Sequence, residues 1–213
     1  MPSELAPSDL SRSDARRRAI LDVASEVFLA QGYAATSMSE IAARLGGSKG
    51  TLYNYFRSKE ELFSAFITDT CQGTAMAIFD HVPEMVAGQP IRDTLVKLGV
   101  DFVNFIVSPK LVAINRVVVG ETGRFPELGR MFFDAGPGRG EARFAQIVSR
   151  AMDVGELRRD DPVMVGRCLK DLLISDYHHR QLWGVLGDIS AARIEAHVTA
   201  VVDVFLRAFA PTP

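Results

Sequence analysis

Residues 36–59, TSMSEIAARLGGSKGTLYNYFRSK, contain two short helical patterns joined by a turn at Leu45-Gly46-Gly47. Ser37, with Glu40 three residues later, is a capping-box signature for the first of these helices, and Ser48 is a suitable N-cap for the second. Two short helices joined by a tight glycine turn are typical of a helix-turn-helix. We therefore expect the second helix of this stretch to enter the major groove of DNA.

This second helix is too polar and too aromatic for a core helix. Leu52 and Phe56 lie four residues apart and can anchor it to the hydrophobic core. The remaining residues provide hydroxyls, an amide and a charge that can donate to phosphates or base edges: Lys49, Gly50, Thr51, Tyr53, Asn54 and Tyr55. Lys59, at the start of the next helix, is placed to clamp the DNA backbone. A single tyrosine more often packs than binds, but the whole set favours DNA.

The charge of the chain is divided unevenly, although its formal net charge is only -2. Residues 1–59 hold eight basic and six acidic residues, whereas the rest of the chain holds sixteen basic and twenty acidic residues. A mildly basic head on an acidic body is expected if only the head touches phosphates. Chance scatter of a few charges would give a difference of the same size.

The cysteines and the N-terminus indicate a cytoplasmic protein. Cys71 and Cys168 lie far apart within helical patterns, so we expect buried thiols and no disulfide. The N-terminal sequence MPSELAPSDL has no apolar core of a signal peptide. No apolar run approaches the roughly 18 residues that span a bilayer, so no membrane partner is expected.

Helical periodicity extends along the whole chain, and no segment has the period-2 alternation of a strand. The sequence predicts an all-α fold, with a disordered arm at 1–12, a three-helix helix-turn-helix domain at 13–58, and a helical effector-binding and dimerisation body at 59–213. Proline and glycine punctuate the predicted helices. Their expected ranges are 14–31, 38–45, 49–56, 59–82, 91–107, 110–122, 126–135, 138–154, 162–183 and 191–209.

The N-terminal quarter of the chain resembles the TetR family of transcriptional regulators. The residues that carry the resemblance are Phe28, Gly32-Tyr33, Thr36-Ser37-Met38, Glu40-Ile41-Ala42, the run Gly50-Thr51-Leu52-Tyr53-Asn54-Tyr55-Phe56, and Lys59-Glu60-Glu61-Leu62. The resemblance implies a homodimer with an N-terminal DNA-binding head and a variable ligand-binding body. It also implies DNA contacts from Ser37, Ser48, Lys49, Gly50, Thr51, Tyr53, Asn54, Tyr55 and Lys59. Gly47 departs from the family pattern, which has a small apolar residue there, and a slightly looser turn is expected.

The last predicted helix has a wide apolar face that needs partners, either within the chain or in a second copy. The family resemblance implies a four-helix bundle formed by this helix and the helix over 162–183 from each of two subunits. A two-fold dimer of this kind requires a near-palindromic operator. The residues expected at the dimer interface are Leu169, Leu172, Val198, Val201, Val202, Phe205 and Phe209.

The body contains aromatic residues suited to an apolar effector pocket. The candidate pocket residues are Phe79, Phe102, Phe105, Phe132 and His178, and ordinary core packing is the alternative for any one of the aromatic residues. The leading hypothesis is a dimeric repressor that a small apolar effector releases from its operator. Such release requires tighter effector binding to the state that cannot bind DNA.

A cluster at Asp176, His178 and His179 suggests a different class, an all-α enzyme or a metal-binding helical protein. Adjacent histidines on a helix point about 100° apart, so both cannot bind one ion on a regular helix. Nucleophile-elbow, phosphate-loop and dinucleotide motifs are absent from the sequence, which weakens the enzyme hypothesis. No cofactor or metal is therefore expected.

Overall fold

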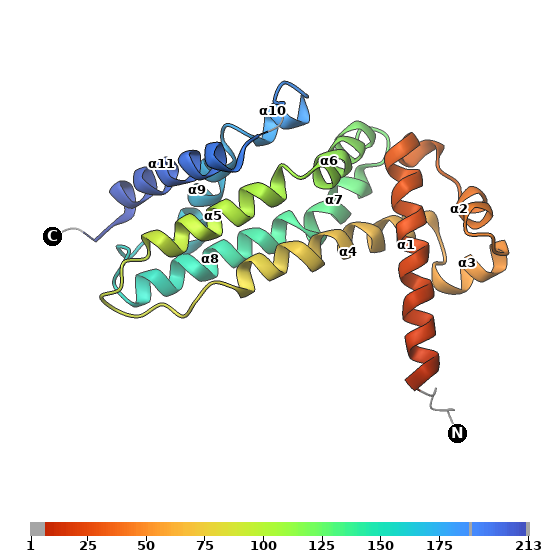
Figure 1. Cartoon of the computed structure of the whole chain (residues 1–213), viewed down its shortest axis with the longest axis horizontal. Coiled ribbons are helices and arrows are strands. Elements are labelled where there is room, and N and C mark those ends of the chain that lie inside the picture. Colours follow the sequence, from red (N-terminus) through yellow and green to blue (C-terminus); the bar gives the residue numbers. More distant parts are fainter. Residues whose placement is uncertain (1–6, 188, 212–213) are drawn as a thin grey trace. The chain divides into compact units, whose positions relative to one another are not determined.

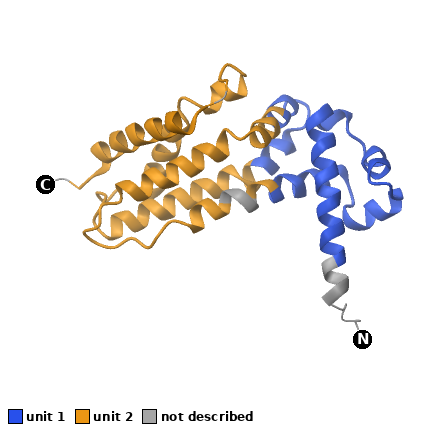
Figure 2. Cartoon of the chain, viewed as in Figure 1, with its two compact units in different colours: residues 1–69, 117–132 blue, residues 70–116, 133–213 orange. Residues whose placement is uncertain are grey.

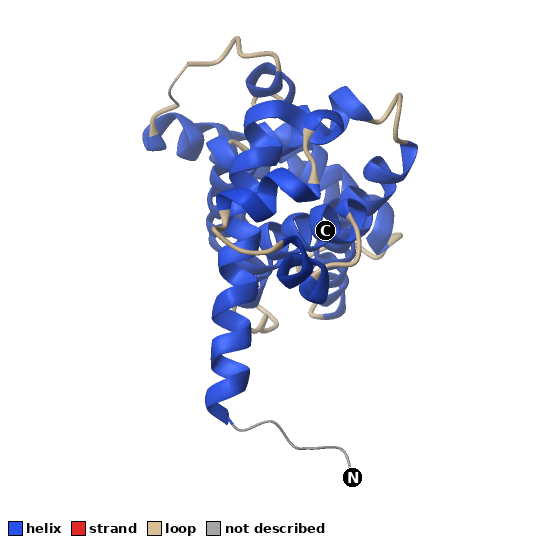
Figure 3. Cartoon of the chain, turned by 90° about the vertical axis from the view of Figure 1, so that its right-hand side faces the viewer, coloured by secondary structure: helices blue, strands red, loops and turns tan. Residues whose placement is uncertain are grey.

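The computed structural model describes residues 7–187 and 189–211, with side chains for residues 12–71, 76–187 and 189–211. Within these residues the chain forms helices and loops and no strand (Figure 3), which confirms the predicted all-α fold. No single described helix has the length and apolar composition of a membrane span. Among the described residues, only the bent pair of α5 (Arg92–Ile106) and α6 (Pro109–Glu121), joined at an angle of 59°, meets that test by length and composition.

The chain divides into two compact units (Figure 2). The first unit comprises residues 1–69 and 117–132, and the second comprises residues 70–116 and 133–213. The boundary falls inside helices, because α4 (Lys59–Asp80), α6 (Pro109–Glu121) and α7 (Pro126–Ala135) each contribute to both units. The remaining helices of the first unit are α1 (Pro7–Ala35), α2 (Met38–Arg44) and α3 (Lys49–Tyr55).

The first helix is longer than the sequence predicted at both ends. Residues 1–6 of the predicted disordered arm lie outside the described residues, but residues 7–12 are helical and belong to α1. Pro7 suits the first turn of a helix, because the N–H that proline lacks would have no partner there. At the other end, α1 continues beyond Gly32 across a kink, at which Gly32 has φ 82° and ψ 173°.

The helix predicted over 162–183 is two helices, α9 (Pro162–Ile174) and α10 (His178–Leu182) (Figure 1). The break coincides with a polar contact, since the Ser175 hydroxyl donates to the Leu172 carbonyl at 2.8 Å. It also lets Tyr177 turn into the core, where its side chain is buried and its hydroxyl donates to the Arg193 carbonyl at 3.1 Å. The helical periodicity of the sequence did not predict this break, because Tyr177 is apolar enough to fit the apolar pattern of one continuous helix.

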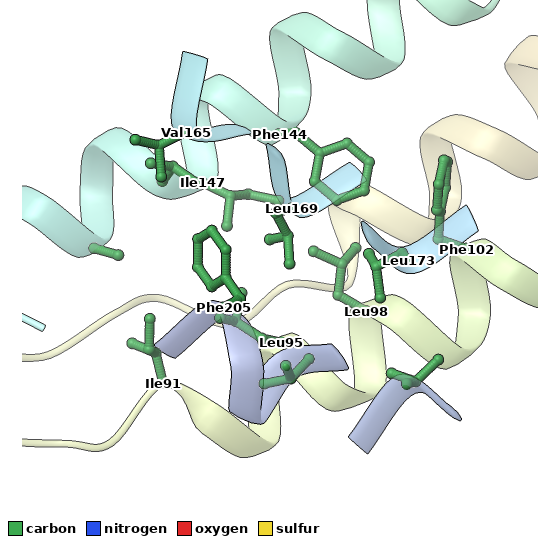
Figure 4. Close-up of a cluster of buried hydrophobic side chains, with 14 of the residues drawn as sticks. Ile91, Leu95, Leu98, Phe102, Phe144, Ile147, Val165, Leu169, Leu173 and Phe205 are labelled. Atoms are coloured by element: carbon green, nitrogen blue, oxygen red, sulfur yellow. The ribbon is translucent and has the colours of Figure 1, made fainter. Parts of the chain in front are cut away.

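The second unit is built around one large hydrophobic core. Its other helices are α5 (Arg92–Ile106), α8 (Pro137–Asp153) and α11 (Ala191–Phe209). Figure 4 shows the ring of Phe205 from α11 directed toward Ile147 of α8 and Leu169 of α9. All three side chains are almost completely buried, and each such burial stabilises the fold by about 1.5–3 kcal/mol.

Helices α8 and α9 approach closely at Gly166, where a β-carbon would meet backbone atoms of α8. A β-carbon on Gly166 would lie 2.8 Å from the backbone nitrogen of Ala145. We expect Gly166→Ala to lower the free energy of unfolding by roughly 1–3 kcal/mol, because the backbone of α8 cannot yield as a flexible side chain would. Gly140→Ala in α8 is the matched control, since nothing lies within 4 Å of its new methyl group. Denaturant unfolding of both variants tests this, and equal stabilities would contradict the close approach.

Both cysteines are free thiols, as the sequence predicted. Cys71 is buried, and burial raises the pKa of its thiol to about 11. Cys168 departs from the expectation of burial, because it lies on α9 and is only half-buried.

Candidate nucleic-acid interface

The second helix of the helix-turn-helix, α3, is anchored to the hydrophobic core by the two residues predicted from the sequence. Leu52 and Phe56 are each only 2% exposed. Arg17 of α1 supports the same contact, because its guanidinium carbon lies 5.3 Å from the centre of the Phe56 ring. These contacts fix which face of α3 is turned away from the core.

Serine side chains cap α2 and α3 as the sequence predicted. The Ser37 hydroxyl accepts the Glu40 N–H at 3.2 Å, and the Ser48 hydroxyl accepts the Thr51 N–H at 3.1 Å. Ser58 caps α4 in the same way by accepting the Glu61 N–H at 3.2 Å. Ser37 and Ser48 remain exposed.

The outward face of α3 combines the donor groups that DNA contacts require. Lys49, Gly50 and Asn54 are exposed, and Tyr53 is 40% exposed. The remaining two predicted contacts on this helix, Thr51 and Tyr55, are half-exposed. An ammonium group, an amide and phenol hydroxyls on one short helix can donate to both phosphate oxygens and base edges.

An arginine of α1 lies beside the turn between α2 and α3. Gly46 adopts the left-handed conformation with φ 63°, and the Gly47 N–H donates to the Ala42 carbonyl at 3.3 Å. The guanidinium of Arg16 lies beside this turn, and a β-carbon on Gly47 would be 3.0 Å from its Nη2 atom. The absent side chain at Gly47 therefore leaves room for Arg16.

Lys59 makes contacts within the chain that the sequence did not reveal. Its ammonium group donates to the carbonyls of Tyr33 at 2.9 Å and Thr36 at 3.0 Å, with the Ala34 carbonyl at 3.5 Å. It also lies 4.3 Å from the centre of the Tyr33 ring. Lys59 thus satisfies carbonyls at the end of α1, and donation to a DNA phosphate would compete with these bonds.

Two carboxylates complete the support of the segment after the Gly32 kink. Glu121 at the end of α6 accepts the Ala34 N–H at 2.9 Å, and Glu60 accepts the Tyr33 hydroxyl at 3.0 Å. Burial, followed by the hydrogen bond to Glu60, raises the pKa of the Tyr33 phenol above its ordinary value. Glu121 is about ninety residues from Ala34 along the chain, so no local sequence signal indicates this contact.

The residues predicted for an effector pocket belong to different parts of the structure. Phe79 and Phe102 are buried in the core of the second unit, where their rings are 5.2 Å and 4.9 Å from that of Phe144. Phe132 belongs to the first unit, and His178 is half-buried on α10. The two core phenylalanines follow the usual burial of aromatic residues on helices.

Phe105, the fifth of these residues, lines a groove along α4 and α5 with a volume of about 710 Å³. A neighbouring hollow of about 320 Å³ shares Ile78, His81 and Asp101 with it. These volumes fall in the range of small-molecule sites. The residues that line the larger groove are Thr70, Ala77, Ile78, His81, Asp101, Asn104, Phe105, Ser108 and Lys110.

Four of the seven residues predicted for the dimer interface are fully buried in the core of the chain itself. They are Leu169, Val198, Val202 and Phe205, each 0% exposed. Leu172, Val201 and Phe209 are half-buried. The apolar face that the sequence revealed on α11 is therefore satisfied largely within the chain, by α5 and α9, which is the alternative that the sequence had left open.

The cluster at Asp176, His178 and His179 does not assemble a catalytic or metal site. Asp176 lies 3.2 Å from the Arg180 guanidinium, and the two histidine rings are 5.3 Å apart. Burial, followed by the charges of His179 and Lys170, lowers the pKa of His178. Among the residues with described side chains, no group of three or more histidine, cysteine or acidic residues could hold a metal ion.

Comparison with known proteins is consistent with this geometry. Residues 20–66 match the family of bacterial regulatory proteins named tetR, and residues 93–211 match the C-terminal domain of AefR-like transcriptional repressors. The regulator UidR of Escherichia coli (strain K12) is 30% identical over 176 residues, which cover 82% of each chain. The solved structure of the flavonoid-responsive regulator FrrA is 30% identical, has a TM-score of 0.79, and aligns with 94% of this chain and 100% of FrrA.

Two further curated relatives match over shorter regions. The transcriptional activator FasR of Mycolicibacterium smegmatis is 42% identical over 83 residues, or 38% of this chain. The chain spans about a third of the length of FasR (33%) and of a further curated regulator from Bacillus subtilis (31%).

The family profiles together cover both the helix-turn-helix and the helical body. Regulators of this family bind DNA operators, dimerise and bind small-molecule effectors, and they are not enzymes. The enzyme hypothesis for Asp176, His178 and His179 is thus unsupported. The chain belongs to the TetR family of transcriptional regulators, with an N-terminal helix-turn-helix for DNA binding and an AefR-like C-terminal ligand-binding domain.

Proposed function

We propose that the protein is a dimeric, cytoplasmic repressor that leaves a palindromic operator when a small effector binds. The observation that carries the DNA-binding part is the exposed face of α3, on which Lys49, Tyr53 and Asn54 project from a helix anchored by Leu52 and Phe56. The proposed DNA contacts are Ser37, Ser48, Lys49, Gly50, Thr51, Tyr53, Asn54 and Tyr55. Lys59 acts mainly by holding the end of α1, and any phosphate contact it makes is secondary.

Binding to DNA from upstream of the protein's own gene tests the proposal. Fluorescence anisotropy across a salt series should give an affinity that falls steeply with salt, because phosphate contacts release counterions. Lys49→Ala should weaken binding similarly for all sequences and lower the salt slope by about 1.

Lys97→Ala is the matched control for this measurement, since Lys97 is an exposed lysine on α5 in the second unit. It should leave both the affinity and the salt slope unchanged. If the Lys49→Ala variant kept the salt slope of the wild type, Lys49 would not contact DNA phosphates. If the wild-type protein formed no salt-dependent complex with DNA, the proposed DNA binding would be contradicted.

The proposed effector site is the groove along α4 and α5 that Phe105 lines. Its wall combines apolar Ala77, Ile78 and Phe105 with polar groups such as Asp101 and Asn104. Such a lining suits a flat, mainly apolar molecule with a few hydroxyls. FrrA, which is flavonoid-responsive, aligns with nearly the whole chain, so we propose a flavonoid-like effector.

A thermal-shift measurement with the flavonoid naringenin tests the groove. Saturating ligand at 100 times its Kd should stabilise the wild-type protein by about 2.7 kcal/mol and raise its Tm. Ala77→Phe should abolish the rise by filling the groove, whereas Ala142→Phe, an exposed substitution on α8 outside the groove, should preserve it. An equal rise in both variants would place the ligand elsewhere, and no rise in the wild type would contradict a flavonoid-like effector.

The proposed dimer surface is the outward face of α9 and α11 and not the buried side chains predicted from the sequence. On α11, Ala196, Ala200 and Val204 recur every four residues and are exposed, and small side chains allow helices to approach closely. On α9, Met164 is 39% exposed. Leu172 of α9 and Val201 of α11, both predicted at the interface from the sequence, are half-buried.

The match of the helical body supports repression as the direction of regulation. Residues 93–211 resemble the C-terminal domain of AefR-like transcriptional repressors. The activator FasR matches over only 83 residues. The longer match supports repression, and a reporter gene behind the operator would show it as higher expression when the protein is deleted.

A further inference from the structure

An arginine of α1 lies next to residues that are proposed to contact DNA. Arg16 lines a small hollow together with Gly47, Ser48 and Thr51. Ser48 and Thr51 belong to the proposed DNA contacts, and their hydroxyl oxygens are 2.9 Å apart. Arg16 itself lies outside the helix-turn-helix, on the helix that passes beside α2 and α3 (Figure 1). A cation from α1 is therefore placed beside the two hydroxyls.

The charge of Arg16 is not neutralised inside the protein. Within the part of the chain whose side chains are described, no carboxylate forms an ion pair with its guanidinium. Arg44 on the neighbouring helix α2 differs, because Glu40 pairs with it at 3.0 Å. Arg16 is also half-buried, so its position is restricted by its surroundings. A positioned cation without an internal partner is suited to an external anion.

The glycine at position 47 determines where this guanidinium lies. A β-carbon on Gly47 would be 3.0 Å from the Nη2 atom of Arg16. A contact this short requires the neighbour to move, and here the neighbour is the end of a flexible side chain. Gly46 has a positive φ of 63°, but Gly47 is not among the glycines with positive φ. Alanine at position 47 would thus displace the guanidinium without straining the turn.

We propose that Arg16 binds a phosphate of the DNA backbone and that Gly47 keeps it in position for this contact. This inference rests on the proposed DNA binding by α3 and adds a contact from outside the helix-turn-helix. A guanidinium presents two parallel N–H donors, which match two oxygens of one phosphate. The adjacent hydroxyls of Ser48 and Thr51 can donate to the backbone as well. Such a contact positions α3 on the duplex and does not read the base sequence.

The dependence of DNA affinity on salt, followed by fluorescence anisotropy, measures the contact. Arg16→Ala should lower the slope of log affinity against log salt by about 1 for each copy bound, because one phosphate contact is lost. Affinity for upstream DNA and for a random duplex should fall by the same factor, roughly 10-fold. Arg16→Lys keeps the charge, so it should retain the slope while losing part of the affinity, since an ammonium group cannot bind two oxygens in one plane.

Arg18→Ala is the matched control, because it removes the same charge from the same helix. Arg18 is exposed, and its position two residues from Arg16 turns it about 200° around the helix axis. It should leave the slope and the affinity unchanged, and circular dichroism should show both variants folded at the assay temperature. A wild-type slope for Arg16→Ala, or an equal loss in both variants, would overturn the proposal.

Gly47→Ala tests the positioning of Arg16. It should lower the salt slope as Arg16→Ala does, because the displaced guanidinium no longer reaches the phosphate. In a protein that already carries Arg16→Ala, it should have no further effect, since the group that it displaces is absent. If Gly47→Ala weakened DNA binding equally in both backgrounds, it would act on the turn itself and the role of Gly47 would be overturned.

The same titrations separate this contact from the proposed function. If the wild-type protein binds DNA with a salt-dependent affinity and Arg16→Ala keeps the wild-type slope, the Arg16 contact is overturned and DNA binding by α3 stands. If the wild-type protein forms no salt-dependent complex, both are overturned.

Discussion

The main effect of Lys59→Ala should be a loss of stability. The substitution removes donors to the Tyr33 and Thr36 carbonyls and a cation above the Tyr33 ring. Bonds to a charged donor contribute about 1.5–3 kcal/mol each, and the half-buried position of Lys59 reduces this through solvent screening. We expect the free energy of unfolding to fall by roughly 2–3 kcal/mol and the Tm to fall by roughly 5–10 °C, as measured by circular dichroism during heating.

Lys49→Ala is the matched control for Lys59→Ala, because Lys49 is an exposed lysine on α3. Its Tm should stay close to that of the wild type, since substitutions at such surface positions usually change stability by less than about 0.5 kcal/mol. The two variants should therefore separate, with Lys59→Ala losing stability and Lys49→Ala losing DNA affinity. If Lys59→Ala melts like the wild type yet binds DNA weakly, Lys59 acts chiefly as a phosphate contact.

Ala200→Arg should convert the protein to a monomer. Ala200 is exposed at the centre of the proposed dimer surface on α11, and two-fold symmetry would bring two unpaired guanidinium groups together there. Burying unpaired charges at an interface costs several kcal/mol. We expect analytical ultracentrifugation to show a rise of at least about 100-fold in the dimer dissociation constant. Operator affinity should fall as well, because a single copy can bind only one half-site.

Ala191→Arg introduces the same side chain on the same helix as a control. Ala191 is also exposed, and nine residues separate it from Ala200, which places the two on opposite faces of the helix at about 100° per residue. Ala191→Arg should remain a dimer. Should Ala200→Arg also remain a dimer, the outward face of α11 is not the interface.

The sequence predicted the elements that depend on local signals. Ser37 and Ser48 cap their helices as expected because a capping hydroxyl acts on an amide only two or three residues away. The ranges 126–135 and 191–209 match α7 and α11, since glycine, proline and serine mark their ends. The resemblance to the TetR family, which rested on about fifty residues, is confirmed by profiles that extend to residue 211.

The sequence did not predict contacts between residues that are far apart along the chain. Lys59 satisfies carbonyls of α1, and Glu121 accepts the N–H of Ala34, and neither pairing has a periodic signature. The same limit applies to α11, because periodicity shows that Val198 and Phe205 are buried but not whether the cover comes from this chain or a second copy. The outward stripe of Ala196, Ala200 and Val204 gave no comparable hydrophobic signal.

Selection of bound sequences from a random pool of DNA duplexes tests the central claim most directly, that two copies of α3 bind one operator. The wild-type protein should enrich an inverted repeat whose half-sites lie about 34–36 Å apart, or a multiple of that distance, along the duplex. Ala200→Arg should fail to enrich it under the same conditions. A pool without any enriched sequence, or one enriched for a single asymmetric site bound by one copy, would contradict the claim.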